Sequence, residues 1–197
     1  MKNFDAILLT AGKSSRMGQD KALLEINGEK VINIILKKLL NSIGSNVYVV
    51  LGHNKEKIEK HIKYNVKIVY NENYENGMYS SIKKGMTALS GNNHVILHMI
   101  DQPFIKPDLY HSLIDCFDKE TMLLQPEYKG KKGHPIIINK KLVPLIKNDN
   151  LNNTLRDFLK PYYKTMRLFK YDNDTVLQNL NNYESFKSAL NKAEFSR

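Results

Sequence analysis

The chain is short of cysteine and of long apolar runs, and both absences narrow what it can be. A lone cysteine, Cys116, excludes an internal disulfide and any metal site built from several cysteines, and it indicates a reducing compartment. No stretch reaches the roughly 18 consecutive apolar residues that a membrane-spanning helix needs. Near the N-terminus the longest apolar run, Ala6–Leu9, is too short for a secretory signal. We therefore expect a cytoplasmic protein that does not enter a membrane.

Acidic residues are outnumbered, since 30 lysines and arginines stand against 20 aspartates and glutamates, and the formal net charge is +10. This charge favours anionic partners without choosing between nucleic acids, lipid headgroups and nucleotides. The aromatic residues are scattered and not interleaved with basic ones, so no nucleic-acid platform is expected. At 197 residues the chain is long enough to bury a core, and we expect one domain over residues 1–197.

Short apolar or β-branched runs alternate along the chain with segments whose apolar residues recur every three or four positions. The runs predict strands over 4–9, 46–51, 66–70 and 95–100, and the periodic segments predict helices over 31–43, 55–63, 80–89 and 107–117. This alternation predicts a Rossmann-like α/β fold, with a mostly parallel, twisted sheet and helices on both faces. Ligands bind such sheets beyond the carboxyl ends of the strands.

Beyond residue 120 the alternation loosens. The sequence predicts an apolar run over 121–124, a basic loop over 128–133, a strand over 135–138, two short helices, a strand over 166–169 and a helix around 183–190. The polar tract 148–153 predicts a mobile loop.

The loop over 11–21, directly after the first strand, combines glycines, hydroxyl groups and cations. Gly12 and Gly18 allow the backbone to approach a ligand closely. A polyphosphate could be surrounded by the polar side chains of the loop, which include Lys13, Ser14, Arg16 and Lys21. The loop is not a P-loop, because that motif needs a glycine five residues before Gly12, where this chain has Ile7.

The order of residues in this loop resembles the signature of the MobA-like nucleotidyltransferases, which include the molybdenum cofactor cytidylyltransferases and guanylyltransferases. The matching pattern is Leu9-Thr10-Ala11-Gly12-x-Ser14-x-Arg16-Met17-Gly18-x-x-Lys21. Four further blocks resemble the family in the same order, at 71–85, 101–103, 130–135 and 172–175. The resemblance implies a glycosyltransferase-A-type nucleotide-binding fold. The Ala11-Gly12 pair is more similar to the cytidylyl branch than to the guanylyl branch.

The resemblance implies roles for particular residues on the donor side. The nucleotide-binding set it implies is Leu9, Thr10, Ala11, Gly12, Ser14, Arg16, Lys21, Gly77, Ser80 and Ser81. Arg16 and Lys21 would hold the β- and γ-phosphates and offset the charge on the leaving pyrophosphate. Lys13 either assists them or points to solvent. Ser80 and Ser81 either cap the helix that follows or contact the nucleotide.

The resemblance also implies a magnesium cofactor, because Mg²⁺ needs only one or two carboxylates besides phosphate oxygens. Asp101 is the first candidate ligand and a catalytic residue together with Arg16 and Lys21. A second ligand would come from the last of these blocks, residues 172–175, called the closing block below, where we favour Asp174 over Asp172. His134 would contact the acceptor, although a structural role for this histidine explains the sequence equally well.

The implied reaction transfers a nucleoside monophosphate, CMP from CTP, to a phosphorylated small molecule, with molybdopterin as the expected acceptor. A molybdoenzyme or a maturation protein would then be a candidate partner. The sequence departs from the family pattern at two places that bear on the acceptor. The family has an acidic, glycine-rich stretch before an arginine, and this chain has Asp149-Asn150-Leu151-Asn152-Asn153-Thr154-Leu155-Arg156 there. The family has Pro-Glu-Asp after the last block, and this chain has Val176-Leu177-Gln178. The alternatives are transfer to a sugar phosphate or to phosphocholine, and a basic binding module without catalysis.

Overall fold

The centre of the molecule is a parallel sheet built around β1 (Phe4–Leu9). In the computed structural model, which describes residues 3–44, 46–151, 153–180, 184 and 186, β1 pairs in parallel with β4 (Val47–Leu51) and with β6 (His94–Met99). β5 (Lys67–Tyr70) continues the sheet in parallel beyond β4. All six residues of β1 and all five of β4 are buried, because helices cover both faces.

The second half of the chain extends the same sheet through one antiparallel strand. β9 (Ile136–Ile138) lies between β6 and β7 (Leu123–Tyr128) and runs antiparallel to both, and β10 (Met166–Lys170) pairs in parallel with β7 at the edge. The strand order is therefore β10-β7-β9-β6-β1-β4-β5. The predicted mostly parallel α/β fold is confirmed, with β9 as the antiparallel strand within this order.

The basic segment 128–133, predicted as a loop, is instead part of a hairpin. β7 continues to Tyr128, and β8 (Lys131–Lys132) pairs with it antiparallel. The two turn residues, Lys129 at φ 48° and Gly130 at φ 77°, both have the left-handed backbone of a tight hairpin turn. The prediction of a loop was wrong. A lysine rarely adopts this left-handed conformation, so the sequence held no sign of a two-residue turn at Lys129-Gly130.

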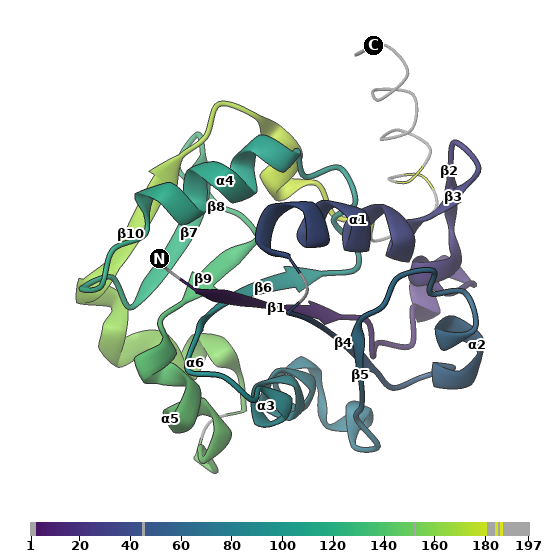
Figure 1. The fold of residues 1–197 in the computed structure, drawn as a ribbon, viewed down its shortest axis with the longest axis horizontal. Helices are drawn as coiled ribbons and strands as arrows, with labels where there is room; N and C mark the ends of the chain where they lie inside the picture. The colour runs from purple at the N-terminus through teal and green to yellow at the C-terminus, as the bar shows by residue number, and fades with distance from the viewer. Residues whose placement is uncertain (1–2, 45, 152, 181–183, 185, 187–197) are drawn as a thin grey trace.

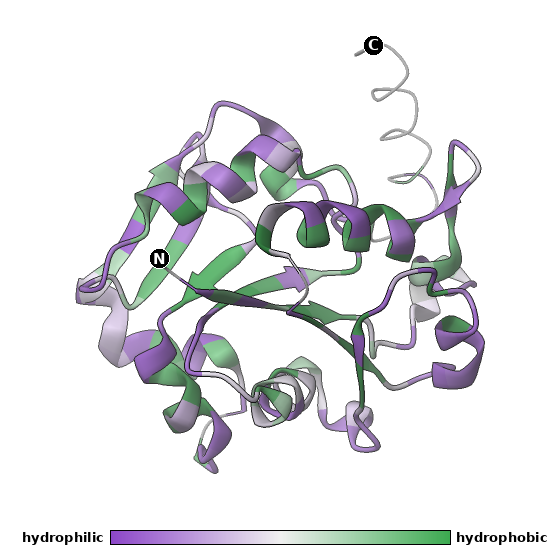
Figure 2. Cartoon of the chain, in the orientation of Figure 1, coloured by the Kyte–Doolittle hydropathy of each residue, from purple (hydrophilic) through white to green (hydrophobic). Residues whose placement is uncertain are grey.

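Two helical layers cover the sheet, one on each face. α1 (Val31–Ile43) and α4 (Pro107–Cys116) lie on one face, while α3 (Met78–Ala88), α5 (Val143–Lys147) and α6 (Leu155–Leu159) lie on the other (Figure 1). The central strand β1 and the inward faces of these helices are hydrophobic, and the outward faces of the helices are more hydrophilic (Figure 2). Two hydrophobic clusters follow from this arrangement, one on each side of the sheet. In the part of the chain that the structure describes, no helix is long and apolar enough to cross a membrane.

Shorter elements complete the chain. They are η1 (Ser15–Met17), η2 (Lys21–Leu23), the hairpin of β2 (Glu25–Ile26) and β3 (Glu29–Lys30), α2 (Lys55–Glu59), η3 (Tyr74–Asn76), η4 (Lys140–Leu142), η5 (Lys160–Thr165) and η6 (Asp174–Leu177). α2 ends earlier and α3 begins earlier than the sequence predicts. The helix predicted around 183–190 lies almost entirely outside the described residues.

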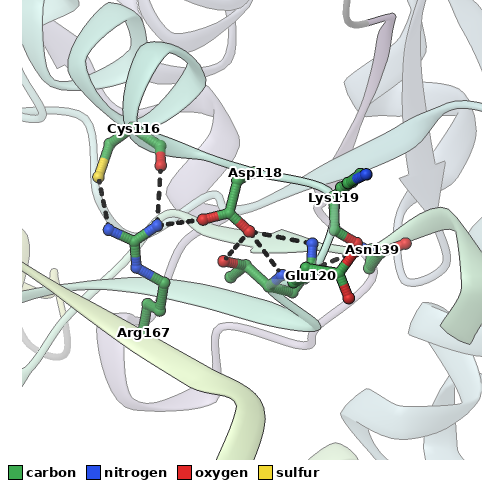
Figure 3. A network of polar contacts seen from close by, with 7 residues as sticks. Cys116, Asp118, Lys119, Glu120, Asn139 and Arg167 are labelled. Carbon is green, nitrogen blue, oxygen red and sulfur yellow. Dashed lines mark hydrogen bonds and ion pairs between the residues drawn. The ribbon is translucent and has the colours of Figure 1, made fainter.

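A polar network fixes the edge of the sheet to the end of α4. The Arg167 guanidinium on β10 contacts the Asp118 carboxylate and donates to the Cys116 carbonyl at 3.4 Å (Figure 3). The same carboxylate accepts from the backbone N–H of Thr121 at 2.9 Å, and the Asn139 amide donates to the Thr121 carbonyl at 2.8 Å. The turn between α4 and β7 is thus held by β10 and by the end of β9.

One histidine of β6 makes the fold sensitive to acid. His98 is fully buried, its Nδ1 lies 2.8 Å from the Met99 carbonyl oxygen, and its ring stacks on Tyr110. Burial lowers the pKa of His98 to about 3. In the unfolded chain the same histidine takes up a proton below about pH 6.5, so acid favours the unfolded state.

We therefore expect the wild type to lose stability between pH 7 and pH 4.5 faster than a His98→Phe variant. The unfolding free energy of the wild type minus that of His98→Phe should fall by about 2–3 kcal/mol from pH 7 to pH 4.5. Each pH unit between the folded and unfolded pKa values of His98 contributes about 1.4 kcal/mol. Urea unfolding of both proteins at the two pH values measures this change. A parallel loss of stability in both proteins would contradict it.

Candidate active site

The site is centred on an ion pair between residues 80 positions apart in sequence. The Lys21 Nζ lies 3.4 Å from the Asp101 Oδ2, and the two side chains are only 15% and 17% exposed. Lys21 follows the loop after β1, and Asp101 follows β6. Because β1 and β6 are parallel neighbours, their carboxyl ends lie side by side and bring the two loops together.

The loop after β1 folds back on itself before it reaches Lys21. The Lys21 backbone N–H donates to the Ser14 Oγ at 3.2 Å, which closes the loop. Ser14 at φ 51° and Gly18 at φ 67° provide the left-handed turns on either side of η1. A Cβ at Gly12 would meet no atom within 4 Å, so the backbone there faces open space, as a ligand would require. Arg16 lies in η1, and its side chain falls outside the described part of the structure.

The side chains of the first three residues of the predicted nucleotide-binding set are buried. Leu9, Thr10 and Ala11 are at most 5% exposed, and Leu9 and Ala11 belong to the hydrophobic cluster under α3. Their backbones continue the sheet, since the Thr10 N–H donates to the Val50 carbonyl at 2.9 Å. Contact between these residues and a nucleotide stays a prediction.

A buried aspartate that the sequence did not single out holds the far end of the loop. The Asp20 carboxylate, 6% exposed, accepts from the Asn54 amide at 3.1 Å and pairs with the Lys57 ammonium at 3.3 Å. The loop is thereby tied to the start of α2. An acidic residue directly before Lys21, in a loop otherwise rich in cations, was the signal that could have found it.

Lys13 does not face this centre. Its ammonium pairs with the exposed Glu75 carboxylate of η3 at 2.6 Å, and this contact raises the pKa of Lys13 and lowers that of Glu75. The sequence left open whether Lys13 assists Arg16 and Lys21 or points to solvent. In the structure its side chain is 53% exposed and links the first loop to η3.

The turn into α3 is held by Asn71. Its amide donates to the Ser80 Oγ at 2.9 Å and to the Ser81 Oγ at 3.0 Å. Gly77, at φ 90° and ψ 176°, adopts a backbone conformation that is essentially restricted to glycine, and α3 begins at the next residue. Neither serine caps the helix from its N-cap position. Their hydroxyls shape the turn, and a contact between them and a nucleotide stays a prediction.

The residues just after the closing block pack directly on the Asp101 loop. The Leu180 N–H donates to the Asp101 carbonyl at 2.8 Å, and the Gln102 amide donates to the Asn179 side-chain oxygen at 2.8 Å. η6, which begins at Asp174, precedes these contacts. The Asp174 carboxylate accepts from the Gln178 amide at 2.9 Å. The pKa of Lys129 is raised mainly by the Tyr128 hydroxyl and to a smaller degree by Asp172 and Asp174.

No group of three or more histidine, cysteine, aspartate or glutamate side chains that could hold a metal ion is found among the described residues. The Asp101 carboxylate is nevertheless partly exposed and offers hard oxygen atoms beside a cation. That donor type fits Mg²⁺, which takes its remaining ligands from water and phosphate. The choice between Asp174 and Asp172 as a second ligand stays a prediction.

His134 connects Asp101 to the second half of the site. Burial lowers the pKa of His134, and the Asp101 charge opposes this shift. The His134 N–H donates to the Val176 carbonyl at 3.1 Å, and a Cβ at Gly133 would collide with that same carbonyl oxygen. The glycine before His134 is therefore required for the close crossing of the two chain segments.

A cavity of about 630 Å³ opens on the far side of His134. Its floor is the apolar face of β6, β7 and β9, which includes Leu97, Met99, Leu123 and Ile136. Its rim carries two cations, Lys132 on β8 and Arg156 on α6. The described residues that line the cavity include no aspartate or glutamate. The cavity therefore suits a ligand with an apolar body and negative charge.

The wall that carries Arg156 is fastened to α3 by Asp149. The Tyr79 hydroxyl donates to the Asp149 Oδ2 at 2.7 Å, and Tyr79 and Asp149 are 5% and 9% exposed. The Lys83 ammonium, one turn further along α3, contacts the Asp149 carbonyl. The Thr154 Oγ then accepts from the Asp157 N–H and begins α6. The tract 148–153, predicted as a mobile loop, is anchored at Asp149.

We expect Tyr79→Phe to lower the unfolding free energy by about 1–3 kcal/mol, because it leaves a buried carboxylate with one partner fewer while keeping the ring that lines the cavity. Urea unfolding measures the loss. Tyr171→Phe is the matched control, since its hydroxyl donates to the more exposed Asp108 carboxylate at 3.2 Å, where water can replace it. Equal losses in the two variants would contradict the anchoring role of Tyr79.

Comparisons with known proteins agree with this geometry. Residues 6–167 match the profile of the MobA-like NTP transferase domain. The chain is 29% identical over 158 residues to the molybdenum cofactor cytidylyltransferase of Escherichia coli, with 78% of this chain and 79% of that protein covered. It is 26% identical over 198 residues to the molybdenum cofactor guanylyltransferase of Campylobacter jejuni, covering 96% and 98%. A solved Methanothermobacter nucleotidyl transferase shares the fold over 100% of both chains, with a TM-score of 0.84 at 20% identity.

Proposed function

The chain belongs to the MobA-like NTP transferase family, and we propose that it transfers CMP from CTP to a phosphorylated acceptor that binds in the cavity beside His134. An oxygen of the acceptor phosphate attacks the α-phosphorus of CTP. The bond from that phosphorus to the oxygen bridging to the β-phosphate breaks, and pyrophosphate leaves. The observation that carries the proposal is a shared contact: His134, which lines the cavity, and Gln102, the residue after Asp101, both donate to the Val176 carbonyl oxygen, at 3.1 Å and 3.3 Å.

On the donor side the protein supplies charge and position, which are the main sources of rate in reactions of this kind. Lys21 would offset the charge that develops on the leaving pyrophosphate. The open backbone at Gly12 and at Gly77 would allow close approach of the nucleotide. Asp101 would hold Mg²⁺, which when bound neutralises phosphate charge.

CTP is the preferred donor because of the Ala11-Gly12 pair and the similarity to a cytidylyltransferase over most of the chain. The guanylyltransferase relative covers more of the chain at slightly lower identity, so GTP is the competing donor.

The cavity supports molybdopterin over the other acceptors. A sugar phosphate carries hydroxyl groups on both faces of its ring, and those against the apolar floor would lose their hydrogen bonds to water, whereas a flat heterocycle keeps its polar groups at the ring edge, within reach of lining side chains such as Gln125 and Asn153. Phosphocholine carries a cation, and no carboxylate is present among the described lining residues to pair with it. A flat heterocycle with a phosphate group would bury its rings on the floor and reach Arg156 or Lys132 at the rim.

The direct test is product formation with each combination of donor and acceptor. The purified protein with Mg²⁺ is incubated with CTP, GTP, ATP or UTP, and with molybdopterin, a sugar phosphate or phosphocholine. Pyrophosphate release and the mass of the product are measured. We expect turnover with CTP and molybdopterin. Turnover with GTP alone would move the proposal to guanylyl transfer, and turnover only with another acceptor would overturn the assignment of the cavity.

Asp101→Ala should lower turnover by at least about 10²-fold, because it removes the proposed metal ligand from the centre of charge. The unfolding midpoint should change little, since Lys21 retains some access to water. Pyrophosphate release and thermal unfolding are measured on the same sample. Glu120→Ala, which removes an exposed carboxylate in the turn between α4 and β7, serves as the comparison. Unchanged turnover in Asp101→Ala would exclude the metal role.

Lys21→Ala should weaken binding of CTP by about tenfold or more and leave binding of CMP nearly unchanged, because the ammonium is assigned to the leaving phosphates. Isothermal titration with each nucleotide in the presence of Mg²⁺ measures both affinities. An equal loss for CTP and CMP would contradict that assignment.

A further inference from the structure

Lys38 is half-buried beneath the loop that follows Asp101, where the sequence pattern of α1 predicts a solvent-facing lysine. Its Nζ donates to the Pro103 carbonyl at 2.6 Å and to the Ile105 carbonyl at 2.8 Å. Burial lowers the pKa of Lys38 to about 8. The neighbouring Lys37 is exposed, so the two adjacent lysines of one helix differ sharply in environment.

The carbonyls that Lys38 contacts belong to a segment without regular secondary structure. β6 ends at Met99 and α4 begins at Pro107, so the backbone groups between them need partners from elsewhere. Pro103 and Ile105 are buried, and water cannot easily replace a lost donor there. A single ammonium group of α1 satisfies both carbonyls.

The Asp101 end of this segment is held by another part of the chain. The Leu180 N–H, just after η6, donates to the Asp101 carbonyl, and the Gln102 N–H donates to the Met99 carbonyl at 3.2 Å. The segment therefore has two supports, one from α1 and one from the residues just after η6. Lys38 is the support that comes from the helix layer.

We propose that Lys38 is a positioning residue, which fixes the backbone over residues 101–105 and thereby holds the Asp101 carboxylate beside Lys21. Its effect on turnover rests on the proposed function, whereas its effect on the loop does not. Lys38 itself contacts neither Lys21 nor Asp101 in the described hydrogen bonds, and it acts only through the backbone. The cost of burying an ammonium group is then offset by the order that it gives to the catalytic loop.

The first test measures the loop directly in the protein without ligands. Hydrogen–deuterium exchange is followed in the amides of residues 101–106 in the wild type, in Lys38→Met and in the matched control Lys37→Met. We expect exchange in this segment to become at least about tenfold faster in Lys38→Met and to stay unchanged in Lys37→Met. Lys38→Arg, which keeps donors at the same place, should restore part of the protection. Unchanged protection in Lys38→Met would overturn the proposal.

The second test asks whether the order of the loop reaches the site through Asp101. Binding of CTP with Mg²⁺ is titrated in the wild type, Lys38→Met, Asp101→Asn and the double variant. We expect Lys38→Met to weaken binding by about tenfold in the wild-type background and to have no further effect in the Asp101→Asn background, because residues that act through one another are not additive. Fully additive losses, or no loss in Lys38→Met, would overturn the positioning role.

The two tests separate the failure of the proposal from the failure of the proposed function. If the wild type binds none of the triphosphates, the proposed function fails, and the exchange measurement still decides whether Lys38 holds the loop. If Lys38→Met is too unstable to study, Lys38→Arg in both tests carries the decision, since it should match the wild type more closely than a variant that lost its fold.

Discussion

The parallel pairing of β1 with β6 is the constraint on which the site depends. It places the end of β1 next to the end of β6, so a loop near residue 20 meets a loop near residue 100 at one edge of the sheet. Lys21 and Asp101 then lie within 3.4 Å, largely shielded from water, where opposite charges attract more strongly than at the surface. The pair therefore fixes both loops and concentrates charge at one point.

The second half of the chain adds a different environment to this point. β9 enters the sheet antiparallel beside β6, and the segment before it carries His134 up to the Asp101 loop. On the other side of His134 the sheet face is apolar, and the rim supplies cations from β8 and α6. In the proposed function, a charged donor and a phosphorylated acceptor would have separate places that meet at His134. Transfer of a nucleotide between two molecules requires such a division.

Much of the first half of the fold could be predicted from the sequence. The runs around Phe4–Leu9 and Val47–Leu51 are continuous and apolar, as strands buried on both faces are, and the helix over 31–43 has a clear period. The motif also located Lys21 and Asp101, because each follows a strand of the parallel sheet. The remaining features depend on contacts between residues far apart in sequence. The Tyr79–Asp149 hydrogen bond joins residues 70 positions apart, and periodicity carries no information on such a pair.

Lys38 shows why a pattern of polar and apolar residues has limits. Its position on α1 is that of a surface lysine, and Lys37 beside it is one. Its long aliphatic chain allows the ammonium group to reach the buried carbonyls of the loop after β6. The turn at Lys129-Gly130 shows the same limit. Its first residue is a lysine in the left-handed backbone conformation, which lysine rarely adopts. In both cases the tertiary structure overrides the local preference.

The most direct test of the account is a crystal structure of the protein with a non-hydrolysable CTP analogue and Mn²⁺ in place of Mg²⁺. The account predicts an anomalous manganese peak on the Asp101 carboxylate, the terminal phosphates beside Lys21, and the α-phosphorus open toward His134 and the cavity. A nucleotide bound elsewhere, or a manganese ion held without Asp101, would contradict it.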